Sequence, residues 1–437
     1  MDHDVRGAGG RDPDGDAAGQ ETRLSRPLVF IMAFAAALAV ANIYYAQPLL
    51  TALAEAYRIR KDALGLVITL SQIGYGAGLL LLVPLGDLLD RRKLLTAQML
   101  ATAVVLLAIG TAPTAGVLMT GMVVAGMLSV TPQILVAYAA SLAPPDERGR
   151  VVGVVTSGIV LGILLARTIA GVLADMAGWR SVYLTSAVAV GLTAILLSRM
   201  LPRLKPAKPG LRYWRLVGSV FRLWAREPLL RSRGAIGFFI FAAITTLWTP
   251  LALPLSAPPH SLSYTGIGLF GLAGAAGAVA AARAGGWADR GHAESATFLT
   301  LLTMVVAWAL IALLPWSLAA VIIGVVAIDF GLQATHVLNQ TMIFQIRPEA
   351  RSRLAAAYMM FYSVGCATGA AVGTLAYVRA GWAGVCAVGA AFNLCAVMIW
   401  AFTRARAPVD GKAPCPQSAA GRPDLCVTTT RWDGRAG

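Results

Sequence analysis

Twelve apolar segments, each long enough to cross a bilayer as a helix, make up most of this sequence. A helix needs about 20 apolar residues to span the hydrocarbon core, where backbone N–H and C=O groups must find their partners inside the helix. Only 13% of the residues are charged, against about a quarter in soluble domains. The sequence therefore predicts an all-α integral membrane protein with 12 transmembrane helices. The predicted helices cover residues 27–50, 63–85, 94–112, 115–141, 151–173, 181–200, 234–256, 264–284, 296–314, 317–343, 354–376 and 383–402.

The positive charges between these segments predict which side of the membrane each loop faces. If the N-terminus lies inside, the short inner loops hold nine Lys and Arg residues and the stretch 199–233 adds ten, whereas the outer loops hold five. Cytoplasmic loops carry the excess of Lys and Arg, so we expect both termini in the cytoplasm and the chain in the cell inner membrane. The net charge of +15 belongs to these loops, so no nucleic-acid partner is expected. The five cysteines show no C-x-x-C spacing, which predicts no disulfide framework and no metal site.

The sequence also contains an internal repeat. Residues 141–153, SLAPPDERGRVVG, correspond at a shift of 203 positions to residues 344–356, FQIRPEARSRLAA. Because both copies keep the same membrane orientation, we expect two bundles related by a pseudo-twofold axis along the membrane normal, an arrangement found in transporters. The predicted domains are six-helix bundles at 27–200 and 234–403, joined by a basic linker at 201–233 that contains an amphipathic helix on the inner leaflet. The tails at 1–26 and 404–437 are predicted to be disordered and cytoplasmic.

The loop sequence GDLLDRRKLL at 86–95 resembles the G-x-L-x-D-R-x-G-R-K/R motif of the major facilitator superfamily, although two of its later positions depart from that pattern. In that superfamily the loop is a conformational latch between the two halves. A degenerate copy, GGWADRGH, occurs at the equivalent place, 285–292. The alternative role is a solvated, positively charged anchor. The resemblance implies the latch role for Gly86, Asp90, Arg91, Asp289 and Arg290.

The stretch NIYYAQPLL at 42–50 is similar to the corresponding part of bacterial proton-linked drug and metabolite exporters. Those exporters carry G-x-x-x-G-P-x-x-G-G on their fifth helix, and LGILLARTIAG at 161–171 has Arg167 where Pro is usual. Helix 4 lacks the arginine usual in these exporters, so we expect Arg167 to supply the buried positive charge instead. Small residues in this motif and in its repeat copy, GCATG at 365–369, predict close helix packing. These residues are Gly162, Ala166, Gly171, Gly365 and Gly369.

Asp329 is the one carboxylate deep within a predicted span. It shares a helix face with Gln333 and His336, which follow at spacings of four and seven residues. Its depth is similar to that of Arg167, so the two could form a charge pair across the halves. Two interpretations stay open: Asp329 carries a coupling proton with the help of Arg167 and His336, or it only neutralises Arg167. His336 is a candidate proton relay, or equally a packing group.

The resemblance implies a substrate pathway lined by helices 1, 4, 7 and 10, and these helices with helix 11 hold the candidates for substrate binding. The candidates are Asn42, Tyr45, Gln47, Gln133, Trp248, Gln333, Asn339 and Tyr358. We predict a monomeric secondary active transporter that works by alternating access, is surrounded by membrane lipids, and exports a small organic drug or metabolite in exchange for protons.

The alternatives are an organic-anion uptake symporter or facilitator that binds substrate through Arg167, and a membrane receptor or scaffold without transport. The sequence has no H-E-x-x-H, G-x-S-x-G or Walker A motif, so neither enzyme activity nor a cofactor is expected.

Overall fold

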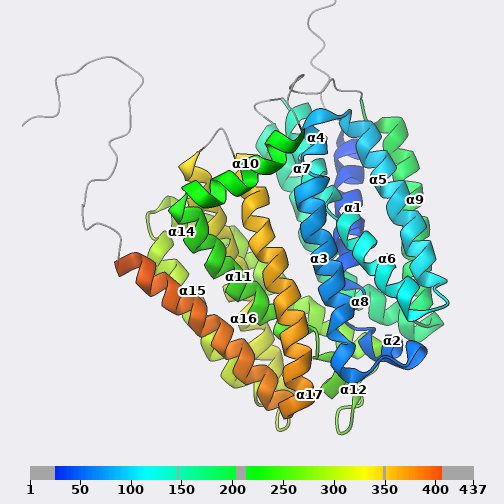
Figure 1. Ribbon diagram of the computed structural model, residues 1–437, viewed down its shortest axis with the longest axis vertical. Coiled ribbons are helices and arrows are strands. Elements are labelled where there is room, and N and C mark those ends of the chain that lie inside the picture. Colours follow the sequence, from blue (N-terminus) through cyan, green and yellow to red (C-terminus); the bar gives the residue numbers. More distant parts are fainter. Residues whose placement is uncertain (1–24, 145–146, 203–212, 348–350, 406–437) are drawn as a thin grey trace, which may run out of the picture.

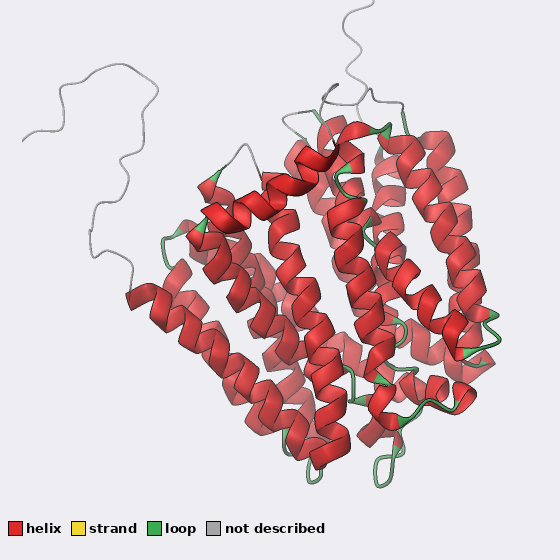
Figure 2. Ribbon diagram, viewed as in Figure 1, coloured by secondary structure: helices red, strands yellow, loops and turns green. Residues whose placement is uncertain are grey.

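The computed structural model describes residues 25–144, 147–202, 213–347 and 351–405, and the regular structure in these ranges is helical throughout (Figure 2). The prediction of an all-α fold is therefore confirmed for this part of the chain. Long helices run between two ends of the molecule (Figure 1). We name them the α10 end, where α10 (Tyr213–Arg226) lies, and the α2 end, where α2 (Leu50–Tyr57) lies.

The remaining helices form two groups that follow one another along the chain. The N-terminal helices are α1 (Arg26–Tyr44), η1 (Lys61–Ala63), α3 (Gly65–Leu81), α4 (Leu85–Leu88), α5 (Arg91–Gly110), α6 (Ala115–Leu128), α7 (Thr131–Leu142), α8 (Arg148–Ala177) and α9 (Trp179–Met200), together with α2. The C-terminal helices are α11 (Pro228–Trp248), α12 (Ala252–Ser256), α13 (Tyr264–Leu269), η2 (Phe270–Ala273), α14 (Gly274–Asp289), α15 (Ala293–Ile311), α16 (Leu318–Ile346) and α17 (Arg351–Ala405).

Ten helical segments among the described residues are long and apolar enough to cross a membrane. The sequence predicts twelve, and the difference arises at two places. Two predicted helices form one continuous element, α17, in which the backbone leaves the helical conformation only at Ala380 and Gly381. The predicted helix 264–284 is interrupted by the 3-10 turn η2, so neither α13 nor α14 is long enough by itself.

Prolines explain why three other predicted spans are broken in the structure. The predicted span 27–50 is helical only to Tyr44, and Pro48 lies in the turn that follows. The span 115–141 is interrupted before α7, whose first turn contains Pro132. The span 234–256 is interrupted after Trp248, just before Pro250. A proline has no N–H to donate to the preceding turn and so favours a new helix start.

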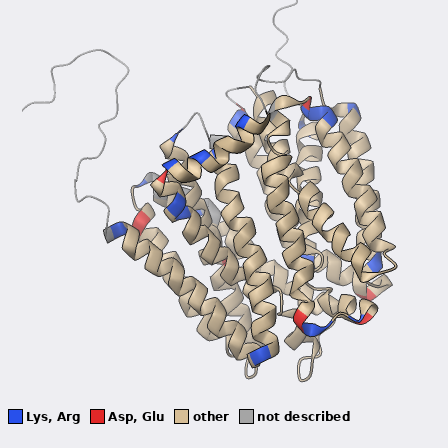
Figure 3. Cartoon of the chain, viewed as in Figure 1, with Lys and Arg blue, Asp and Glu red and all other residues tan. Residues whose placement is uncertain are grey.

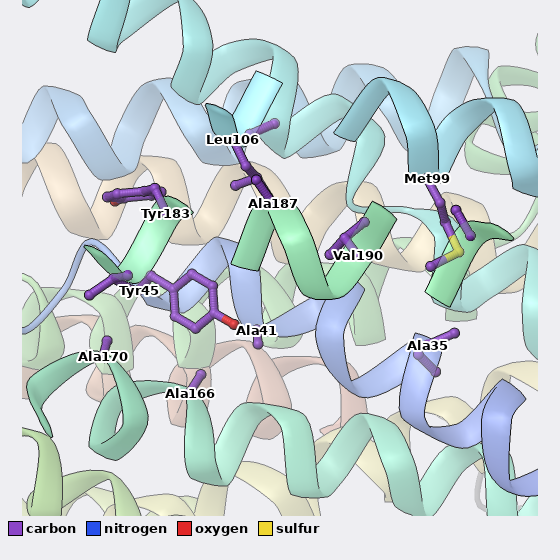
Figure 4. Close-up of a cluster of buried hydrophobic side chains, with 14 of the residues drawn as sticks. Ala35, Ala41, Tyr45, Met99, Leu106, Ala166, Ala170, Tyr183, Ala187 and Val190 are labelled. Carbon is purple, nitrogen blue, oxygen red and sulfur yellow. The ribbon is translucent and has the colours of Figure 1, made fainter. Parts of the chain in front are cut away.

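Buried apolar side chains form two large clusters, one for each group of helices. The first cluster draws on residues 28–201 together with Ala370. Figure 4 shows part of it, with Tyr45 and Tyr183 beside small side chains. The second draws mostly on residues 236–400, with four side chains from the N-terminal helices. Each group of helices thus has a core of its own.

Small residues let helices approach closely within each group. A Cβ added at Gly162 would lie 2.5 Å from the backbone of α1. Cβ atoms added at Gly365 and Gly369 would lie 2.4 Å and 2.1 Å from the backbone of α11. Ala166 is buried in the N-terminal core. At the three glycines, a side chain would have to push the two helices apart.

The two groups touch along an interface between α8 and the α13–η2 segment, near the α2 end. A Cβ added at Gly171 would lie 2.2 Å from the carbonyl oxygen of Tyr264. The hydroxyl of Thr168 donates a hydrogen bond to the carbonyl of Gly268 at 3.0 Å. Nearer the end of α8, the Asp175 carboxylate accepts hydrogen bonds from the first two backbone N–H groups of α13, at 3.2 Å and 2.7 Å. We call this contact the α8 interface.

A second contact between the groups, which we call the α3 interface, joins α3 to α17. A Cβ added at Gly65 would lie 2.5 Å from the carbonyl oxygen of Ala370. The hydroxyl of Thr69 donates to a carbonyl of α17 at 3.2 Å. In the other direction, the hydroxyl of Ser363 donates to the carbonyl of Gln72. The α8 and α3 interfaces thus both join the N-terminal helices to the C-terminal helices.

Candidate functional site

Arg167 lies in the α8 interface, and only 6% of its surface is exposed. Its Nε donates a hydrogen bond to Oε1 of Gln47, 2.6 Å away, in the turn between α1 and α2. The guanidinium carbon lies 4.0 Å from the ring centroid of Trp248 and 4.9 Å from that of Tyr44. Contact with aromatic faces stabilises a guanidinium that has lost its water. Neighbours from both groups of helices therefore hold this buried cation.

Asp329, on α16, is the carboxylate whose charge reaches Arg167. It is 7% exposed, and the Trp248 indole is its polar neighbour. Each of the two charges acts electrostatically on the other, although no direct ion pair joins these two described side chains. Isolated buried charges cost several kcal/mol, and an opposite charge nearby reduces that cost. The structure thus brings Arg167, Asp329 and Trp248 into one site, with the indole adjoining both charges.

Aromatic side chains extend this site along α17. The hydroxyl oxygens of Tyr44 and Tyr362 lie 3.0 Å apart and link α1 to α17. The ring centroid of Tyr362 lies 4.3 Å from that of Phe241 and 5.9 Å from that of Tyr75. Phe241 in turn lies 5.2 Å from the ring of His336. These rings offer flat apolar surfaces and a few hydroxyl groups, the usual lining of a site for a small organic molecule.

The polar residues of α16 and α17 point to two different places. Nδ1 of His336 lies 3.1 Å from the hydroxyl of Tyr358, and Asn339 is a further polar neighbour of that tyrosine. Gln333 packs against α14 instead, because a Cβ added at Gly277 would lie 2.7 Å from its Cγ. His336, Asn339 and Tyr358 therefore form one polar cluster, which Phe241 connects to the aromatic residues.

Three other predicted ligands are not in contact with Arg167. Asn42 accepts a hydrogen bond from a serine of α9, and Tyr45 packs edge-on against a tyrosine of α9 inside the N-terminal core (Figure 4). Gln133, on α7, neighbours Tyr75 and so adjoins the aromatic cluster. The structure does not bring Asn42 and Tyr45 to the site, and their part in substrate binding stays a prediction.

Tyr44, Tyr75 and Phe241 lie in the site although the sequence analysis does not single them out. Tyr44 and Tyr45 are adjacent and point about 100° apart around α1, which follows from the helical repeat. Only the rotation of α1 in the folded protein decides which one faces the C-terminal helices. For Tyr75 and Phe241 the sequence carries no signal, because an aromatic residue in an apolar span looks the same whether it faces a core, lipid or a pathway.

The loop at 86–95 is fixed within the N-terminal helices. Asp90 caps α5 by accepting a hydrogen bond from a backbone N–H of its first turn at 3.0 Å. Arg91 donates to the carbonyl of Gly86 at 2.7 Å and to two residues of α7 at 3.1 Å and 3.2 Å. In the repeat copy, Arg290 is exposed, and the side chain of Asp289 lies outside the described residues. The latch role of all five residues stays a prediction.

The site combines one buried cation, one buried carboxylate, one imidazole and several aromatic rings. Within the described residues, no group of three or more His, Cys, Asp or Glu could hold a metal ion. Carboxylate and imidazole groups can take up and release protons, and the rings can bind an organic molecule. The arrangement therefore suits reversible binding of a small molecule together with a change of protonation.

Comparisons with known proteins agree with this architecture. The sequence profile of the Major Facilitator Superfamily matches residues 29–343. YgaY of Escherichia coli K12, described as an uncharacterized transporter, is 44% identical over 377 residues, which cover 86% of this chain and 95% of that one. SCO4007 of Streptomyces coelicolor, described as a probable transporter, is 34% identical over 402 residues, which cover 91% of each chain. The solved structure of a bacterial homolog of the human lysosomal transporter Spinster, inward-facing and occupied, matches with a TM-score of 0.71 at 13% identity, covering 87% of this chain and 96% of that one.

Proposed function

The chain belongs to the Major Facilitator Superfamily, and on this basis we propose that it is a secondary active transporter that exports a small organic compound in exchange for protons. The transporter works by alternating access, in which a site between the two groups of helices opens to one side of the membrane at a time. The position of Arg167 and Asp329 between those groups is the observation that carries the proposal.

We propose that the helices form twelve membrane spans, arranged as two six-helix bundles. The two parts of α17 on either side of Gly381 count as two spans, and α13, η2 and α14 together count as one discontinuous span. Discontinuous helices are common near transporter binding sites. The bundles are residues 27–200 and 234–403, and the separate apolar cores of the N-terminal and C-terminal helices support this division.

The α10 end faces the cytoplasm of a bacterial cell in this proposal. Most charged residues lie toward the two ends of the molecule (Figure 3), and the loops at the α10 end contain more of the Lys and Arg residues. Cytoplasmic loops show that excess. In this proposal the α8 and α3 interfaces, near the α2 end, close the outer side of the pathway.

Protonation of Asp329 couples transport to the proton gradient. While Asp329 is ionised, its charge balances that of Arg167, and its oxygens can accept hydrogen bonds from a substrate. A proton on the carboxylate turns one of these oxygens into a donor, weakens the other as an acceptor, and leaves the charge of Arg167 uncompensated. Substrate and proton therefore compete for one group, and competition of this kind produces exchange. Neutral amphipathic compounds with an aromatic ring fit such a site best, because Tyr44, Phe241 and Tyr362 supply apolar surfaces.

Uptake of an organic anion is the second candidate, and the buried guanidinium favours it. When Asp329 is protonated, Arg167 has no balancing charge and attracts a carboxylate or phosphate group. Anion and proton would then occupy the site together and cross in the same direction. The two candidates differ in the sign of the coupling between substrate and proton, which makes them separable by experiment.

The test uses purified protein in sealed liposomes with a trapped pH dye and a panel of lipophilic drugs, nucleosides and organic acids. Wild type is compared with Asp329→Asn and with Glu55→Gln, a control that removes an exposed carboxylate on α2. We expect a compound to drive protons in the opposite direction through wild type and the control but not through Asp329→Asn.

If protons move in the same direction as an organic acid, the protein is a symporter and the exchange mechanism is refuted. A compound that crosses all three proteins equally without moving protons would refute the role of Asp329. Transport by none of the three proteins, for every compound of the panel, would contradict the proposed substrate class.

A further inference from the structure

The short helix α10 contacts both groups of helices at the α10 end. The hydroxyl of Tyr213 donates a hydrogen bond to the carbonyl of Leu81, the last residue of α3, at 2.9 Å. Nε1 of Trp224 donates to the carbonyl of Ala357, near the start of α17, at 3.1 Å. Both acceptors lie near helix ends, so α10 runs level with the ends of the spans (Figure 1). This is the depth at which lipid headgroups lie.

One side of α10 is buried and an adjacent side exposes large aromatic residues. Val217, Val220 and Leu223 are buried, and the latter two pack against the C-terminal helices. Trp214 and Phe221 are seven residues apart and therefore share a strip of the helix surface. Trp214 is 71% exposed and Phe221 is 46% exposed. Aromatic side chains exposed at the level of a membrane interface are typical of anchors in the headgroup region.

A third strip of α10 is positively charged. Arg215, Arg222 and Arg226 are all exposed, and their spacings of seven and four residues place them on one face. The helix contains no Asp or Glu, and the carboxylate that follows it, Glu227, is paired with Arg347 at 2.8 Å. Among the described residues, no carboxylate pairs with any of these three guanidinium groups. The strip is therefore a concentrated, unneutralised charge beside an aromatic strip.

We propose that α10 binds anionic phospholipid headgroups of the leaflet at the α10 end. The three guanidinium groups contact lipid phosphates, which arginine binds in a bidentate manner, and Trp214 and Phe221 insert beside them. Anionic lipids are selected because a zwitterionic headgroup brings a positive charge of its own to the same strip. Because α10 contacts α3 and α17, the bound lipid acts on an element that touches both groups of helices.

Native mass spectrometry of the full chain, released from micelles that contain equal amounts of phosphatidylglycerol and phosphatidylcholine, tests this proposal. Wild type is expected to carry phosphatidylglycerol in clear excess. The variant Arg215→Gln/Arg222→Gln/Arg226→Gln loses that excess, with apparent affinity falling about fivefold for each cation removed. All three positions are exposed, and an unchanged elution volume and Tm in phosphatidylcholine micelles verify that the variant folds.

The matched control, Arg58→Gln/Arg60→Gln/Lys61→Gln, removes three exposed cations at the α2 end. We expect this variant to keep the wild-type lipid preference. If both triple variants lose the preference for phosphatidylglycerol equally, only the net charge of the protein determines lipid binding, and the proposal is overturned. An α10 variant that still prefers phosphatidylglycerol would overturn it too. Because the readout is bound lipid rather than transport, it can fail independently of the proposed function.

Discussion

The α8 and α3 interfaces join the same two groups of helices, but they do so with different chemistry. In the internal repeat, a shift of 203 positions places Arg167 of α8 on Ala370 of α17. Both positions lie in close helix contacts and both are buried. The α8 interface nevertheless contains Arg167 and Asp175, whereas the contacts of the α3 interface that we describe are made by hydroxyl and carbonyl groups.

This difference shows that close packing between the groups does not require a charge. Ala370 fills the equivalent position with a methyl group, so the guanidinium at 167 is not there to hold the helices together. A buried cation that packing does not need is best explained by the chemistry of the site. Substitutions that make the two interfaces more alike test this conclusion.

The largest effect is expected from Arg167→Ala, which gives the α8 interface the residue of its repeat counterpart. Asp329 then has no compensating charge, and an ionised carboxylate left alone in the interior costs about 3 kcal/mol. We expect a lower Tm and the loss of proton-coupled transport in liposomes. The double variant with Asp329→Asn should recover the Tm without recovering coupling. Full proton coupling in Arg167→Ala would show that the two interfaces are functionally equivalent.

The next effect concerns the glycines that allow the close approach. Gly171→Ala and Gly65→Ala should each separate the groups at the α2 end, because the added Cβ would meet a carbonyl oxygen at 2.2 Å or 2.5 Å. Overpacking of this kind costs about 1–3 kcal/mol. Spin-label distances across the α2 end measure the separation. Gly153→Ala is the control, since nothing lies within 4 Å of its added Cβ. If only one of the two variants changes the spin-label distances, the interface that contains the other glycine does not close the α2 end.

A smaller effect is expected from Asp175→Asn in the charged interface. An amide oxygen accepts the backbone N–H groups of α13 less strongly than a carboxylate, and the loss is about 1 kcal/mol. The fraction of molecules in which the two groups of helices are separated at the α2 end should rise about fivefold in the same distance measurement. Asp62→Asn, an exposed carboxylate beside Arg60 at the same end, serves as the control. An unchanged distance distribution would show that Asp175 does not help to hold the α2 end closed.

The smallest effect is expected from Ser363→Ala in the neutral interface. The variant loses one hydroxyl donor to the carbonyl of Gln72, worth about 0.5 kcal/mol. The distance distribution should hardly change, as in the control Thr303→Ala, which loses a hydroxyl bond within α15. A shift as large as that of Asp175→Asn would contradict the contrast between a charged and a neutral interface.

Most of the helical architecture could be predicted from the sequence, because the length of an apolar run determines whether it can span a bilayer. The start of α3 and both ends of α16 lie within a few residues of the predicted spans. The breaks before α7 and after Trp248 were harder to place, since a proline can start, kink or end a helix in a membrane. The interruption at η2 has no proline, and we have no sequence rule that predicts it.

The candidate site could be predicted only in part, for a geometric reason. Position along a helix follows from residue number, so Arg167 and Asp329 could be matched in depth. Rotation about the helix axis is set by packing in three dimensions, which the sequence does not display. Tyr44 and Tyr45 therefore could not be distinguished, and Asn42 lies in the N-terminal core instead of beside Arg167. Charged residues were easier to identify than aromatic ones, because a charge is exceptional in an apolar span.

The hydroxyl pair of Tyr44 and Tyr362 has a consequence for the speed of a transport cycle. It joins α1 to α17, so any motion that separates the two groups of helices must break it once per turnover. A bond between two neutral hydroxyl groups contributes only about 1 kcal/mol, and water can replace it on both sides. It therefore adds little to the activation barrier, whereas an ion pair at the same place would slow each opening. Weak contacts of this kind let a protein close its pathway many times without being trapped in one state.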